Sequence, residues 1–269
     1  MKIISGKIEK AQKVVIYGPE GIGKSTFASK FPDPLFIDTE GSTFYLDVKR
    51  FEEIKSYADM IGAITYVGKN PDICKTLVID TMDWAERMIA DEVTKENGWK
   101  SIEDPGYGKG YAVLAEKVQG FLRYLSRITE LGINAVIVAH AMMRKFELPD
   151  EAGAYDRWEL KLQRRTAPIV KEWADAVLFL NYETSIVNKD KSGKGKAMGG
   201  ERVLYANHRP TFDAKNRWGL GDHLTFSFDT ISPFIMHAKD ATKIKKEEPV
   251  KEENPEMEEE KEEEEDGLE

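Results

Sequence analysis

Cysteine is almost absent from this 269-residue sequence, because Cys74 is the only one, so no disulfide can form within the chain. Long apolar runs are absent as well, and no stretch approaches the roughly 20 residues that a helix needs to cross a bilayer. The first 12 residues lack the apolar core of a secretory signal. These absences exclude a disulfide-stapled scaffold and a membrane-spanning protein. We expect a soluble cytoplasmic protein with no membrane partner.

Charge is unevenly distributed along the chain. The net charge is −9, but residues 247–269 contain 14 acidic residues and 2 lysines, which leaves a net of +3 over the first 246 residues. A mildly basic body is compatible with nucleic-acid binding, although the whole-chain charge suggests otherwise. We expect one folded domain over residues 1–242. The acidic segment cannot bury apolar area, so we expect a disordered tail over residues 243–269.

The sequence does contain a phosphate-binding loop pattern, G-x-x-x-x-G-K-S, without a mismatch. An apolar strand is predicted before it at residues 14–17, and a helix after it at residues 25–31. This strand–loop–helix order predicts a nucleoside triphosphate site. The residues expected to bind the nucleotide are Gly18, Pro19, Glu20, Gly21, Ile22, Gly23, Lys24, Ser25 and Thr26.

The residue types of this loop suit ATP and Mg²⁺. Glycines allow successive backbone N–H groups to turn toward phosphate oxygens at the start of a helix. Lys24 supplies a mobile positive charge to the phosphates, and the Ser25 hydroxyl is a ligand of the kind that Mg²⁺ accepts. A glycine-rich turn that matches by chance is the structural alternative.

Predicted strands and helices alternate over the first 180 residues. This pattern predicts an α/β fold with a mostly parallel central sheet, helices on both faces and hairpins toward the C-terminus. The further strands are predicted at 35–38, 76–80, 134–140, 176–180, 184–187, 202–206 and 224–228. The further helices are predicted at 56–67, 84–97, 111–131 and 169–173.

Three polar residues follow predicted strands, where they would meet the loop at one edge of the sheet. Asp80 is expected to bind Mg²⁺, and capping of the next helix is its alternative role. Glu40 follows a strand that we expect beside the phosphate-loop strand, and it could polarise the attacking water. Asp83 competes for that role, and a solvated turn residue remains the alternative for Glu40. His140 could contact the γ-phosphate or be a satisfied core histidine.

The segments FIDTEG (36–41), TLVIDT (76–81) and NAVIVAH (134–140), spaced behind GPEGIGKST, resemble the RecA-type ATPase core. The segments at 106–111 and 214–220 resemble phage-encoded members of that superfamily, the RecA-like single-strand annealing ATPases. The resemblance implies a RecA-like P-loop NTPase fold with Glu40 as the catalytic carboxylate. In RecA-like proteins the residue at the position of His140 is usually Asn or Gln, and its side chain relays the nucleotide state to a DNA-binding loop. A phage-encoded chain would work in the host cytoplasm.

The resemblance also implies activity between subunits. Lys215 and Arg217 resemble the paired basic residues that RecA-like and DnaB-like proteins insert into a neighbouring subunit's ATP site. An isolated subunit would then be a poor ATPase, and a ring or filament would be required. A basic surface turn is the alternative interpretation of these two residues.

Two segments are candidates for binding single-stranded DNA, since both mix cations with polar or aromatic groups. The first, 98–110, contains Trp99, Lys100, Tyr107 and Lys109. The second, 142–168, shows little apolar periodicity and contains Arg144, Lys145, Arg157, Lys161, Arg164 and Arg165. Both could instead be ordinary solvated faces.

We therefore predict an ATP- and Mg²⁺-dependent ATPase that binds single-stranded DNA, assembles with copies of itself and promotes strand annealing or pairing in recombination. A single-strand-binding protein is a further candidate partner, and the acidic tail could compete with DNA for the basic loops. A hexameric helicase or translocase, a nucleotide or small-molecule kinase, and a nucleotide-gated binding protein with negligible hydrolysis remain alternatives.

Overall fold

A computed structural model of the chain describes residues 3–147, 154–187 and 196–237. The predicted acidic tail over residues 243–269 lies outside the described residues.

The predicted alternation of strands and helices is confirmed, with shifts of a few residues at most ends. The helices are α1 (Lys24–Ala28), α2 (Tyr57–Lys69), α3 (Met82–Glu96), α4 (Lys109–Glu130) and α5 (Thr166–Trp173). The strands are β1 (Lys13–Gly18), β2 (Pro34–Asp38), β3 (Lys49–Arg50), β4 (Thr76–Asp80), β5 (Asn134–Glu147), β6 (Ala154–Leu160), β7 (Ala176–Val187), β8 (Lys196–Tyr205), β9 (Lys215–Asn216) and β10 (His223–Thr225). The strands predicted at 176–180 and 184–187 are one continuous strand, β7.

The central sheet has the order β10-β8-β7-β1-β5-β4-β2-β3, with β6 paired to β5 and β9 paired to β7. Strands β7, β1, β5, β4, β2 and β3 run parallel, and the remaining pairings are antiparallel. We expected the strand that precedes Glu40 to lie beside the phosphate-loop strand, and this was wrong. That strand is β2, and β5 and β4 separate it from β1.

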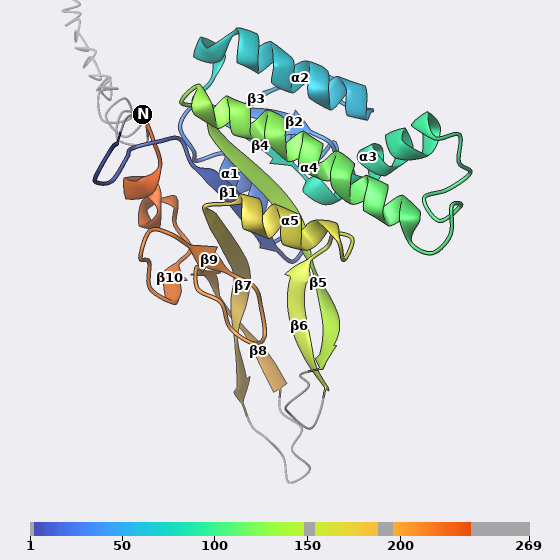
Figure 1. Cartoon of the computed structure of the whole chain (residues 1–269). Helices are drawn as coiled ribbons and strands as arrows, with labels where there is room; N and C mark the ends of the chain where they lie inside the picture. The colour runs from blue at the N-terminus through green and yellow to red at the C-terminus, as the bar shows by residue number, and fades with distance from the viewer. Residues whose placement is uncertain (1–2, 148–153, 188–195, 238–269) are drawn as a thin grey trace, which may run out of the picture.

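Each face of the parallel strands is covered, because alternate side chains of a strand point to opposite faces. Helices α2, α3, α4 and α5 pack on one face over residues such as Val15, Ile37 and Ile137 (Figure 1). Helix α1 and the segment around Ile231 cover the other face over residues such as Val14 and Val136. Burial on both faces explains why these strands are almost uninterrupted apolar sequences.

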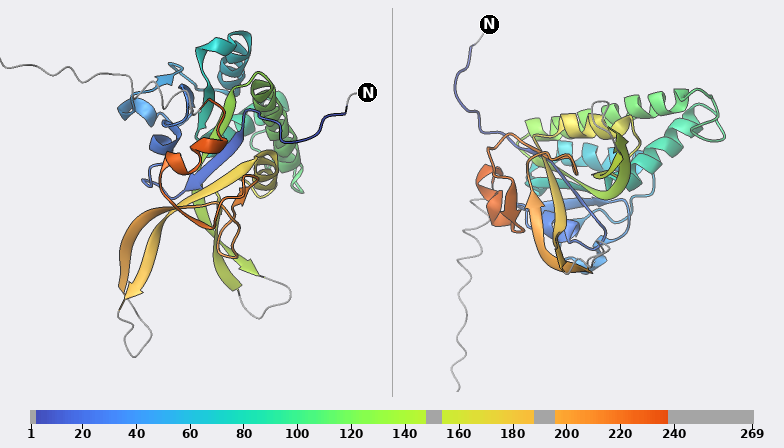
Figure 2. Two further views of the ribbon diagram at one scale, coloured as in Figure 1. Left: turned by 90° about the vertical axis from the view of Figure 1, so that its left-hand side faces the viewer. Right: turned by 90° about the horizontal axis from the view of Figure 1, so that it is seen from below.

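The two strands beside β1 are longer than β1 itself. Strand β1 ends at Gly18, which is in register with His140 of β5, whereas β5 continues to Glu147 and β7 to Val187. The extensions pair with β6 and β8, and the two hairpins leave the same edge of the sheet and diverge (Figures 1 and 2). We call them the β5–β6 arm and the β7–β8 arm. The phosphate loop therefore begins between their bases.

The β5–β6 arm corrects the expectation of an irregular loop over residues 142–168. Exposed Met143, Lys145 and Glu147 alternate with the less exposed Arg144 and Phe146. This is the period of a strand, but the inward positions are not consistently apolar, so apolar periodicity alone does not reveal it.

Arg157 of β6 was expected on an accessible surface as a DNA contact, but it is buried, with an exposed fraction of 8%. Its guanidinium forms an ion pair with Asp213, which also pairs with Lys171. The Tyr17 hydroxyl donates to the backbone carbonyl of Asp213, which joins this cluster to β1. Arg157 thus anchors the β5–β6 arm to the segment after β8.

We expect Arg157→Ala to lower the free energy of unfolding by about 3 kcal/mol, because removing one partner leaves a buried charge poorly compensated. Lys145→Ala, on the exposed side of the same arm, should leave stability unchanged. Urea unfolding followed by circular dichroism measures both. Equal stability of the two variants would mean that this ion pair does not anchor the arm.

Candidate nucleotide-binding site

The phosphate loop has the backbone geometry that its glycines permit. Gly21 and Gly23 have φ angles of 74° and 100°, which side chains rarely allow. A Cβ on Gly18 would lie 2.3 Å from the carbonyl oxygen of Leu180 in β7. Gly18 is thus required by the close approach of β7, and the other two by the turn of the loop.

Lys24 lies within the loop rather than in solvent. Lys24 is only 6% exposed, and its Nζ donates a hydrogen bond to the carbonyl oxygen of Pro19 at 2.9 Å. Burial lowers the pKa of the amine, and the carboxylates of Asp80, Asp83, Glu40 and Glu20 oppose that shift. These four carboxylates therefore surround one cation.

Asp80 ends β4 and is fully buried. Neither of its carboxylate oxygens has a hydrogen-bond partner among the described residues. Burial raises the pKa of this carboxyl to about 6. The Asp38 and Glu40 carboxylates add to the rise, while the nearby Ser25 hydroxyl and Lys24 oppose it.

A buried carboxylate without a partner, close to a hydroxyl, fits a hard cation such as Mg²⁺. Among the described residues there is no group of three or more His, Cys, Asp or Glu side chains that could hold a metal by itself. Mg²⁺ commonly uses one or two protein ligands together with water and phosphate oxygens. Asp80 and Ser25 would hold such an ion, which when bound would neutralise charge on the phosphates.

The loop that carries Glu40 is organised by Asp38 at the end of β2. Its Oδ1 accepts the backbone N–H groups of Glu40, Gly41 and Ser42, and its Oδ2 accepts both the N–H and the hydroxyl of Thr43. Burial alone would raise the pKa of Asp38, but these donors hold it below its ordinary value. Glu40 is half-buried on this pinned loop. Its charge acts on both Asp80 and Lys24, although β2 is distant from β1.

His140 is paired with Asp83, the first-turn acid of α3. Asp83 accepts the backbone N–H of His140 at 3.1 Å, and its Oδ2 lies 3.0 Å from the imidazole Nδ1. Both residues are buried, and hydrogen bonds from His140 lower the pKa of Asp83 against the effect of burial. Asp83 is thus committed to His140, which leaves Glu40 the more accessible of the two candidate bases.

Both arms contact the phosphate loop. Lys161, just after β6, lies 3.7 Å from the carboxylate of Glu20. Arg202 of β8 donates to the carbonyl oxygen of Ile22 at 3.4 Å. The sequence marks neither contact, because the partners are more than 100 residues apart.

The comparisons with known proteins identify the family. A family model described as an AAA domain matches residues 10–218. The chain belongs to the AAA domain family. With its intact phosphate loop, it is a P-loop ATPase of that family.

Two further similarities to this AAA-domain chain are distant. The SPbeta prophage-derived uncharacterized protein YorG of Bacillus subtilis (strain 168) is 22% identical over 184 residues, 67% of this chain and 52% of that protein. The chain thus spans about half the length of that relative. The crystal structure of the KaiC-like protein PH0186 from Pyrococcus horikoshii OT3 has 14% identity and a TM-score of 0.38, and covers 74% of this chain and 87% of that one.

The predicted DNA contacts of the AAA-domain chain fall into different environments. Arg144 is mostly covered, since it donates to the carbonyl of Leu162 at 2.7 Å and lies 3.5 Å from Glu159. Of the predicted DNA-contact residues, those that are exposed are Lys100, Tyr107, Lys109, Lys145, Arg164 and Arg165; the same segments also expose the acidic Glu103, Asp104, Glu147 and Asp156. The segment 98–110 connects α3 to α4 and does not follow the end of a strand.

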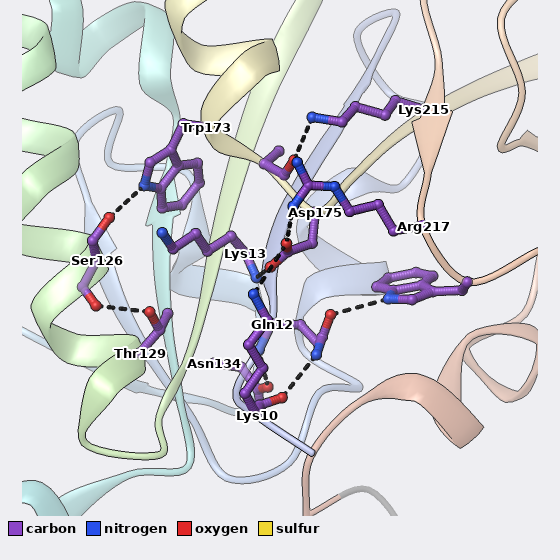
Figure 3. Close-up of polar contacts among 12 residues, drawn as sticks. Lys10, Gln12, Lys13, Ser126, Thr129, Asn134, Trp173, Asp175, Lys215 and Arg217 are labelled. Atoms are coloured by element: carbon purple, nitrogen blue, oxygen red, sulfur yellow. Dashed lines mark hydrogen bonds and ion pairs between the residues drawn. The ribbon is translucent and has the colours of Figure 1, made fainter. Parts of the chain in front are cut away.

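Lys215 and Arg217 lie at the opposite edge of the sheet from the phosphate loop, near the start of β1 (Figure 3). The Lys215 ammonium donates to three backbone carbonyls, those of Lys171, Glu172 and Ala174, and so caps α5 with all three protons. Arg217 is exposed and pairs with the buried Asp175 at 2.9 Å. Of the two predicted intersubunit cations, only Arg217 has a side chain available to a neighbour in this conformation.

No described helix has the length and apolarity to cross a membrane. Four site residues were not singled out from the sequence for the parts they play here: Asp38, the paired Asp83 and His140, and Arg202. Asp38 had a local signal, because an aspartate before Gly, Ser and Thr donors is typical of a side chain that caps its own turn. The other contacts depend on the sheet order.

We expect Asp80→Asn to stabilise the nucleotide-free protein at pH 7 by about 2 kcal/mol, because the variant removes a buried carboxylate without a partner. The pKa of Asp80 is higher in the folded chain than its ordinary 3.8, so the cost of ionisation is absent below about pH 4 and grows toward pH 6. The gain in stability should therefore vanish in acid. Urea unfolding between pH 4 and pH 7.5 measures it.

Asp83→Asn is the matched control, since the pKa of Asp83 is lowered and its carboxylate is satisfied by His140. It should destabilise the protein at pH 7. A stability gain for Asp80→Asn that does not change with pH would contradict the raised pKa.

Proposed function

We propose that this P-loop ATPase is stimulated by single-stranded DNA and promotes annealing or pairing of DNA strands, with ATP hydrolysed between subunits. The single observation that carries the DNA part is an exposed basic surface built from two distant segments. The prophage origin of the relative YorG supports a role in phage DNA metabolism.

This surface consists of Lys100, Tyr107, Lys109, Arg164 and Arg165, and we call it the basic loop surface. The two segments meet where the Arg165 guanidinium lies 3.2 Å from the position that a Cβ on Gly108 would occupy. Tyr107 is completely exposed at a φ of 48°. Exposed cations beside an exposed aromatic ring suit a single strand, whose phosphates they neutralise and whose bases can stack.

Helix α3 links this surface to the nucleotide edge. The helix begins at Met82, directly after Asp80, and its Asp83 holds His140. One turn later, Glu86 accepts the backbone N–H of Gln163 at 2.9 Å and the hydroxyl of Thr166. A change at Asp83 or His140 can therefore be transmitted through a single rigid helix to the segment that carries Arg164 and Arg165.

Glu40 is the base that we assign to hydrolysis. It is half-buried on a loop fixed by Asp38, and no hydrogen bond of its own carboxylate is present among the described residues. A positioned carboxylate can orient and deprotonate the attacking water. Lys24 would stabilise charge on the transferring phosphoryl group, and His140, held by Asp83, would contact it or the water.

Arg217 is assigned to a neighbouring subunit's site. Its partner Asp175 donates its backbone N–H to Lys13 at the start of β1, whereas the phosphate loop begins at Gly18. This length of strand is about 16 Å, well beyond the reach needed for a phosphate contact in the same chain. An arginine supplied by a second copy would neutralise transition-state charge and require a ring or filament.

The test of hydrolysis compares steady-state ATP turnover with and without single-stranded DNA for the wild type, Lys24→Ala, Glu40→Gln and Arg217→Ala. DNA should stimulate the wild type, and each variant should lose at least 100-fold in kcat. Mixing Glu40→Gln with Arg217→Ala should restore part of the turnover, because some interfaces then pair two intact halves. No restoration would place Arg217 outside the neighbour's site.

The test of the DNA surface is Arg164→Glu combined with Arg165→Glu. The double variant should weaken single-stranded DNA binding at least 10-fold at low salt and abolish stimulation, while basal hydrolysis is retained. Lys69→Glu, on the last turn of α2, is the control charge reversal. A wild-type rate of ATP hydrolysis that is the same with and without single-stranded DNA would contradict the DNA function. Transfer of phosphate to a small acceptor would then favour a kinase.

A further inference from the structure

The phosphate loop is contacted from the side opposite Asp80 by Arg202, a residue with no recognisable sequence signal. Arg202 lies on β8, opposite Tyr182 of β7, just beyond the level at which β1 ends. Its guanidinium donates to the Ile22 carbonyl at the long distance of 3.4 Å. The same group lies 2.9 Å from the position that a Cβ on Gly23 would occupy. A larger residue at Gly23 would therefore collide with it.

An aromatic platform holds this guanidinium in place. It lies 4.6 Å from the ring centroid of Phe226, within cation–π range. Phe226 packs edge-on against Phe27 of α1 with centroids 5.5 Å apart. Because α1 also carries Lys24 and Ser25, the platform packs against the helix that continues the phosphate loop. Among the described residues, no carboxylate lies within 4.0 Å of Arg202.

The sheet order determines which end of a nucleotide Arg202 would meet. Ser25 and Asp80 would hold the metal-bound end of the nucleotide, and Asp80 lies on the β5, β4 and β2 side of β1. Arg202 lies on the other side, beyond β7. A triphosphate held at Ser25 and Asp80 that crosses the loop away from them would bring its α-phosphate and nucleoside toward Arg202.

We propose that Arg202 binds the α-phosphate end of the bound nucleotide, and that Phe226 positions it. On binding, the guanidinium exchanges its long hydrogen bond to the Ile22 carbonyl for a charge-assisted bond to a phosphate oxygen. The α-phosphate is common to ATP and ADP, and its charge does not change during hydrolysis. Arg202 therefore contributes equally to both affinities and does not assist the chemical step. This inference rests on the nucleotide site of the proposed function.

The experiment measures the Kd of Mg²⁺ complexes of fluorescent ATP and ADP analogues, together with KM and kcat for ATP, in the full chain. Arg202→Gln should raise both Kd values and KM about 10-fold and change kcat by less than about two-fold. Arg202→Lys, which keeps the charge but not the planar stacking, should recover part of the affinity. Phe226→Leu should weaken both nucleotides in the same direction by a smaller factor.

Arg87→Gln is the matched control, since Arg87 lies 4.6 Å over the ring of Trp84 on the exposed side of α3. It removes the same charge and the same kind of stacking away from the loop and should change neither Kd.

If the wild type binds nucleotide and Arg202→Gln binds it with the same Kd, this assignment alone is overturned. A fall in kcat of Arg202→Gln at unchanged KM overturns it as well. Absence of nucleotide binding in the wild-type chain overturns the proposed function together with this assignment. Thermal unfolding without nucleotide, equal for Arg202→Gln and the wild type, shows that the loss of affinity is local.

Discussion

The site depends on one geometric constraint: β1 stops at Gly18, while the strands on both sides of it continue as arms. The phosphate loop must therefore turn back between two hairpin bases. Neighbouring backbone comes so close that Gly18 has no room for a side chain, because the Leu180 carbonyl occupies that space. Lys161 and Arg202 then contact the loop from the two arms. The loop is therefore in contact with both arms.

Electrostatic balance is the second constraint on this edge of the sheet. Four carboxylates meet one buried cation, Lys24, and like charges at such distances cannot all be ionised without compensation. Two of them have partners within the fold, since Asp83 pairs with His140 and Glu20 lies 3.7 Å from Lys161. Asp80 and Glu40 are left without such partners. The two unsatisfied carboxylates are those to which metal binding and water activation are assigned.

The opposite edge of the sheet is organised around Asp175, a buried carboxylate that accepts the backbone N–H of Lys13 and pairs with Lys10 and Arg217. Figure 3 shows these groups converging at the start of β1. The two edges are separated by the length of β1, so they communicate within one chain only through the sheet. In the proposed assembly, a second copy would bring its Arg217 to this loop and so join the two edges directly.

The sequence by itself determined the phosphate loop, the alternation of strands and helices, and Asp80 at a strand end. These features are local, since each depends on residue type within a few positions of the chain. The tertiary structure alone decided the sheet order, which places β5 and β4 between β1 and the strand that precedes Glu40. It also decided which cations are available, since Arg157 is buried with Asp213 and Lys215 caps α5. The partner of a charged side chain lies tens to hundreds of residues away, and no local pattern records that distance.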